Sequence, residues 1–96
     1  MDRATEKILR IARSFPCLEK KLQNWHPTEF DPDQFYAKMD GASHVEGLCA
    51  LFVLTVWNPA DARTKGWEFD LFDFAGAADP GNRRALMEWL ANPDWP

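Results

Sequence analysis

The sequence predicts an all-α protein, a compact bundle of five to six short helices around one buried central helix at about residues 43–57. Two observations carry this prediction. Helix-start and helix-stop residues recur along the chain, and the segments between them repeat their apolar residues at helical spacing. One of these segments is apolar around almost its whole circumference, so other elements must cover it on every side.

The first two helices are expected before residue 28. The first carries a one-sided stripe of small and apolar residues: Ala4, Ile8, Ile11, Ala12 and Phe15. Pro16 interrupts this helix. A second, short helix follows with Leu18, Leu22 and Trp25 on one side, and Pro27 ends it.

The third helix is expected to begin at Asp31-Pro32, because Asp31 can cap the free backbone donors and Pro32 fits the first helical position. Phe30 and Phe35 occupy the two positions of a hydrophobic staple, which sets the angle at which the chain joins the helix. Gly41 suits the left-handed residue that follows a helix.

The central helix has a start signal and a stop signal. Ser43 and Glu46 match a capping box, and Asn58-Pro59 ends the helix. Gly47 lies in its first turn, where glycine costs up to about 1 kcal/mol relative to alanine. We therefore expect another backbone to approach closely at Gly47.

The aromatic run that begins at Trp67 fits two periodicities. Apolar and acidic residues alternate up to Leu71, as in a strand, whereas Trp67, Leu71 and Phe74 recur at helical spacing. A strand needs a partner, and the only other β-branched run follows a strong helix cap, so we predict a helix. The alternative is an α+β fold with a hairpin formed by residues 51–57 and 67–72.

The segments on either side of this run are simpler. Residues 60–66 are expected to form a water-exposed loop after the central helix. The last helix is predicted to start at Asp79-Pro80 and to stop at Asn92-Pro93.

Length and composition indicate one globular domain over residues 1–96. A hydrophobic content of 46%, with five Trp and seven Phe, argues against disorder. The apolar segment from Cys49 to Trp57 is too short to span a bilayer, and no secretory signal is visible at the start. These features predict a cytoplasmic protein of bacterial type without a membrane association.

Charge is distributed unevenly along the chain. Residues 1–24 hold six basic and three acidic residues, a net charge of +3, whereas residues 25–96 carry −7. The basic residues of positions 1–24 are interleaved with acids and lack clustered aromatic neighbours, so we do not expect this protein to bind nucleic acid. We interpret the basic helix as packing beside an acidic body.

No pattern in the chain matches a known metal or cofactor site. Cys17, Cys49, His26 and His44 are the only soft metal ligands, and their spacings match no compact zinc site. Single, scattered glycines exclude a phosphate-binding loop. The three acids within residues 68–73 lack the spacing of a calcium loop and indicate a solvated face. We predict no metal, no cofactor and two reduced structural thiols.

Because no catalytic arrangement is evident, we predict a small non-catalytic accessory or adaptor protein that acts through protein–protein contacts. Tryptophans near helix ends are typical anchors of protein interfaces. The candidate protein-binding surface consists of Trp25, His26, Trp89 and Trp95. The partner is a protein of unspecified identity, and self-association into a homo-oligomer stays open.

Two alternative functions remain. The first is an acidic decoy that inhibits a nucleic-acid-binding protein, which would require the acids of residues 25–96 to share one face. The second, less favoured, is a small enzyme that uses His26 or His44 with nearby carboxylates. These carboxylates would be Glu46 or the pair Asp70 and Asp73.

Overall fold

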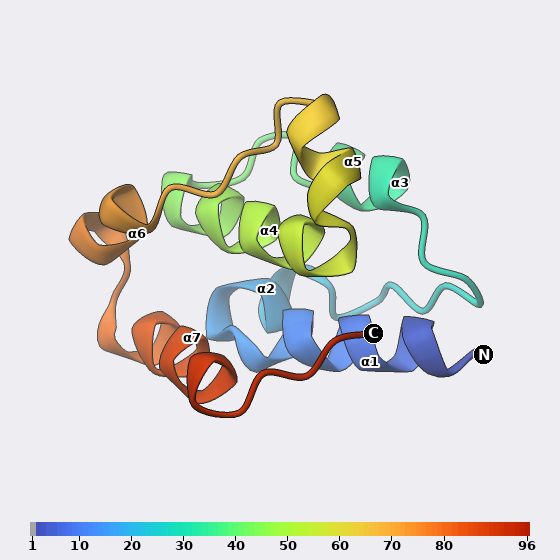
Figure 1. The fold of residues 1–96 in the computed structure, drawn as a ribbon, viewed down its shortest axis with the longest axis horizontal. Helices are drawn as coiled ribbons and strands as arrows, with labels where there is room; N and C mark the ends of the chain where they lie inside the picture. The colour runs from blue at the N-terminus through green and yellow to red at the C-terminus, as the bar shows by residue number, and fades with distance from the viewer. Residues whose placement is uncertain (1) are drawn as a thin grey trace.

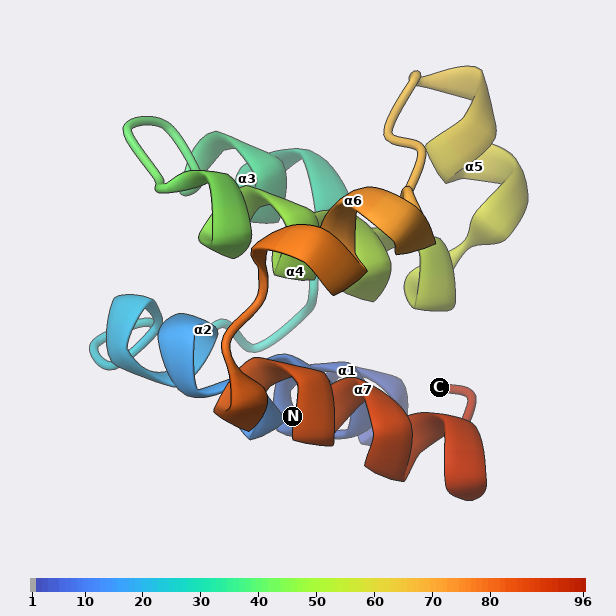
Figure 2. The same cartoon turned by 90° about the vertical axis from the view of Figure 1, so that its left-hand side faces the viewer.

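In the computed structural model, which describes residues 2–96, the helices form two layers (Figures 1 and 2). One layer contains α1 (Arg3–Ser14), α2 (Pro16–Lys21) and α7 (Pro80–Ala91). The other contains α3 (Pro32–Ala37), α4 (His44–Trp57), α5 (Pro59–Thr64) and α6 (Leu71–Ala77). Residues 2–96 contain no strand, so the all-α prediction is confirmed and the hairpin alternative is wrong.

The buried central helix is confirmed as α4. The Ser43 side chain accepts a hydrogen bond from the Glu46 N–H at 3.2 Å, and the Glu46 carboxylate accepts one from the Ser43 N–H at 2.7 Å. Seven of its 14 residues are buried, and α4 contacts helices of both layers, α1 and α2 in one and α3, α5 and α6 in its own. Leu51 and Trp57 are only half-buried, so the cover around this helix is nearly but not fully closed.

A buried threonine that the sequence patterns did not single out connects α1 to the segment before α3. The Thr5 hydroxyl donates to the Asp2 carboxylate at 3.0 Å and accepts from the Phe30 N–H at 3.0 Å. Hydrogen bonds from the Thr5 N–H and hydroxyl also lower the pKa of Asp2 below its ordinary value. This arrangement satisfies the polar groups of a fully buried side chain.

The expected loop at residues 60–66 is instead largely helical, since α5 covers Pro59–Thr64. The Asn58 N–H bonds to the last turn of α4, while the Asn58 side chain accepts from the Asp61 N–H at 3.0 Å. Pro59 occupies the first helical position. The same Asn-Pro pair therefore ends one helix and starts the next, which raises the number of helices in residues 2–96 to seven.

The helix predicted over the aromatic run is confirmed only from Leu71 onward. Residues 67–70 have no regular secondary structure, yet Trp67 is only 8% exposed. The helix starts later than its apolar spacing suggests, because the Asp70 carboxylate accepts the N–H groups of Phe72 and Asp73 at 2.9 and 3.0 Å. Phe74 is the buried residue of the resulting helix α6.

The chain ends on the surface of α1. After α7 the tail turns back along α1 (Figure 1), where the Lys7 ammonium group lies 3.2 Å from the Asp94 carboxylate. Among residues 2–96, no helix combines the length and the apolar character needed to cross a membrane.

Candidate functional site

An open groove of about 860 Å³ lies between the α3–α4 connection, the first turns of α4 and the segment that leads into α6. Its apolar lining includes Tyr36, Met39, Leu48 and Leu51. Its polar lining includes His44 and four carboxylates, Asp40, Glu68, Asp70 and Asp73. Within the described part of the chain, no Lys or Arg contributes to the lining.

Two glycines shape this groove. Gly41 has a φ of +76°, a conformation that side chains disfavour, and it turns the chain from α3 toward α4. Gly47 lines the groove on α4, and a Cβ placed there would meet no atom within 4 Å. The expected close approach of another backbone at Gly47 is therefore wrong. Its missing side chain leaves space in the groove instead.

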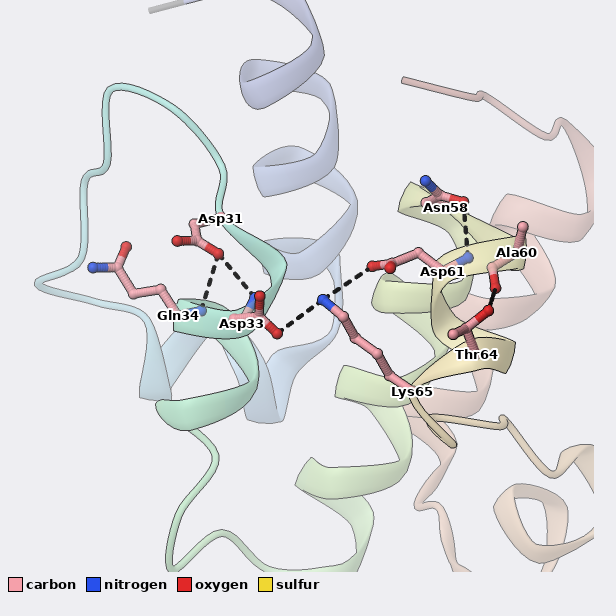
Figure 3. Close-up of polar contacts among 8 residues, drawn as sticks. All are labelled: Asp31, Asp33, Gln34, Asn58, Ala60, Asp61, Thr64 and Lys65. Carbon is pink, nitrogen blue, oxygen red and sulfur yellow. Dashed lines mark hydrogen bonds and ion pairs between the residues drawn. The ribbon is translucent and has the colours of Figure 1, made fainter.

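One wall of the groove is held by the contacts of Lys65 with Asp33, Asp61 and Trp67, which we call the brace. Tyr36 stacks on Trp67 with ring centroids 4.7 Å apart, and the Lys65 ammonium group lies 4.8 Å from the Trp67 centroid. Figure 3 shows the same ammonium group between α3 and α5, at 2.9 Å from Asp33 and 3.3 Å from Asp61. The hydrogen bond with Asp33 is the main cause that raises the pKa of Lys65. The brace fixes Tyr36 at the edge of the groove.

The other wall joins α4 to α6. His44 Nε2 lies 2.9 Å from the Asp73 carboxylate, and both side chains are substantially exposed. The structure thus brings together two residues of the enzyme alternative. Glu46 is engaged in the α4 cap and Asp70 in the α6 cap, while His26 lies exposed between α2 and α3. Glu46 and Asp70 therefore cap helices, and His44 and Asp73 connect α4 to α6.

The tryptophans of the candidate binding surface fall into two separate sets. Trp25 is half-buried and packs against Phe30, with the ring centroids 6.3 Å apart. Trp89 is also half-buried, and its ring meets that of Trp95 at 5.0 Å. No aromatic contact in residues 2–96 joins Trp25 to either of the other two, and none of these residues lines the groove.

Trp95→Ala is expected to lower the free energy of unfolding by about 1 kcal/mol or less, because Trp95 is 56% exposed and loses one edge contact with Trp89. A denaturant melt measures this change. Trp89→Ala is the matched comparison, since the Trp89 ring also packs on Phe52 at 5.2 Å, and we expect about 2 kcal/mol or more. Equal losses for the two variants would show that Trp95 covers the core.

The groove could not be found from sequence patterns alone. The three acids of residues 68–73 were visible, but only the fold brings them next to Asp40, and no local signal marks Leu51 as a groove residue. In residues 2–96, no three His, Cys, Asp or Glu side chains gather closely enough to hold a metal ion. Family models, curated proteins and solved structures give no match to this chain.

Proposed function

We propose that this protein is a non-catalytic adaptor that binds a basic segment of a partner protein in the groove between α3, α4 and α6. One observation carries the proposal: four carboxylates from two segments far apart in the sequence, Asp40 and residues 68–73, line this groove, and no Lys or Arg of residues 2–96 belongs to the lining. A lining of one charge sign attracts a segment of the opposite sign and orients it during encounter.

The apolar part of the groove supports the same proposal. Tyr36 is 47% exposed, while Met39 and Leu51 are half-buried beside it. An apolar side chain of the partner would remove these groups from water, and burial near the centre of an interface supplies most of its affinity. The best ligand is therefore a basic segment with one apolar anchor residue.

The four carboxylates of the groove differ in whether they make hydrogen bonds within the protein. Asp70 caps α6 and Asp73 pairs with His44, so changes there would disturb the fold. Asp40 and Glu68 are exposed, and their side chains make no hydrogen bond within residues 2–96. These two residues can be changed to test binding with the fold left intact.

The test uses a panel of synthetic peptides: basic with an apolar anchor, basic without an anchor, and acidic with an anchor. The double variant Asp40→Lys/Glu68→Lys is expected to weaken binding of the anchored basic peptide by at least about tenfold. Glu29→Lys/Glu88→Lys makes the same change in net charge at exposed positions outside the groove. Fluorescence anisotropy at two salt concentrations measures both. Equal losses for the two double variants would refute binding at the groove.

The acidic decoy is a second candidate, because the fold does place acids from distant segments around one groove. A decoy has to match a broad basic surface and needs no apolar anchor. Two results together favour the decoy over the adaptor. The anchored and unanchored basic peptides bind the protein equally well, and DNA does not bind to the protein and displace either peptide from the groove.

A further inference from the structure

Cys17 and Cys49 lie side by side, although 32 positions separate them in the sequence. Their Sγ atoms are 3.6 Å apart, and both thiols are free. Cys17 is the second residue of α2 and is half-buried, whereas Cys49 lies in α4 and is fully buried. The prediction of structural thiols did not include this contact.

The contact makes the two thiols chemically different. A hydrogen bond from Cys49 stabilises the Cys17 thiolate and lowers the pKa of Cys17, against the opposing effects of burial and of Glu46 and Asp79. The same contact, together with burial, raises the pKa of Cys49. The half-buried sulfur is therefore also the better nucleophile at neutral pH.

We infer that Cys17 and Cys49 form a modification site, which reacts with low-molecular-weight disulfides and closes to a disulfide between α2 and α4. In the first step the Cys17 thiolate attacks one sulfur of the reagent disulfide. A mixed disulfide forms on Cys17, and the other half of the reagent leaves as a thiolate. Cys17 reacts first because solvent reaches it and does not reach Cys49.

The second step uses Cys49 as the resolving thiol. Once Cys17 carries the mixed disulfide, it is no longer a thiolate that accepts the Cys49 hydrogen bond, so the largest cause of the raised pKa of Cys49 is removed. The Cys49 thiolate then attacks Cys17 Sγ and releases the second reagent thiol. The protein loses two electrons and two protons, and the reagent disulfide is reduced to two thiols. The sulfur separation falls from 3.6 Å to about 2.0 Å.

The experiment treats the reduced full chain with oxidised glutathione, blocks remaining thiols with iodoacetamide and maps the products by mass spectrometry. Wild type is expected to end with a Cys17–Cys49 disulfide and no bound glutathione. Cys49→Ala should stop with one glutathione on Cys17, whereas Cys17→Ala should leave Cys49 unmodified. A wild-type end product that retains glutathione, or a Cys17→Ala variant that reacts as fast as Cys49→Ala, would overturn the inference.

Two readouts on the wild-type chain need no variant. At early times the first glutathione should map to Cys17, and first modification of Cys49 would contradict the proposed order. The closed form should melt higher than the reduced form by on the order of 10 °C, because the cross-link restricts the unfolded chain. A closed form that melts below the reduced form would show that the two thiols are not placed for closure.

Discussion

Phe52→Ala is expected to lower the free energy of unfolding by about 3–5 kcal/mol, as truncation of a buried phenylalanine does in other cores. Phe52 is 7% exposed and lies midway along α4. Its ring meets those of Phe15, Phe69 and Trp89 at 5.7, 5.3 and 5.2 Å, so contacts to three different segments would be lost together. A domain of this size has a total stability on the order of 5–15 kcal/mol, so the expected loss is a large fraction of it.

A urea melt followed by far-ultraviolet circular dichroism measures this loss. Phe72→Ala is the matched control, because it removes the same atoms from a side chain that is 87% exposed. We expect it to change the free energy of unfolding by about 0.5 kcal/mol or less. A Phe52→Ala variant as stable as the Phe72→Ala variant would contradict the buried position of α4.

The parts of the fold that were predictable are those that neighbouring residues determine. The capping box at Ser43 and Glu46 and the Asp31-Pro32 start depend on contacts within four residues, and both occur as expected. The Phe30 and Phe35 rings of the staple also meet, at 5.3 Å. Such local geometry follows from side-chain caps on free backbone donors and from apolar contacts between residues close in the sequence.

The errors arose where one signal serves two purposes. Asn58-Pro59 predicts a helix stop, although the same residues can also cap and begin a helix. At Asp70, a cap interrupts an apolar pattern that by itself would support a longer helix from Trp67. In both places the side-chain hydrogen bonds of one polar residue decide where a helix begins.

The candidate site was less predictable than the fold, because it depends on contacts between distant segments. Asp40 and Glu68 lie on opposite sides of α4 in the sequence, and Cys17 meets Cys49 only after α2 packs on α4. No spacing rule links residues so far apart. The tryptophan surface is predicted from residue type and from positions near helix ends, which indicate that an aromatic side chain can anchor a partner but not where a groove forms.

Phe74→Ala tests the link between the core and the groove, because Phe74 is the buried residue of α6. Its ring packs on Phe15 at 6.4 Å and on Phe69 at 5.6 Å, so truncation should lower the free energy of unfolding by about 3–5 kcal/mol. Hydrogen exchange should show the α6 amides losing protection before those of α4. The wall that carries Asp73 would then no longer be held in place.

Leu71→Ala is the control for this variant, since Leu71 belongs to the same helix and is 49% exposed. It should retain both the stability and the peptide affinity of the wild type to within about 1 kcal/mol. Without denaturant, the α4 amides of Phe74→Ala should still be protected from hydrogen exchange. The variant should nevertheless lose affinity for the anchored basic peptide, because one wall of the groove depends on α6. If Phe74→Ala keeps full affinity while its stability falls, the peptide binds elsewhere and the groove is not the binding site.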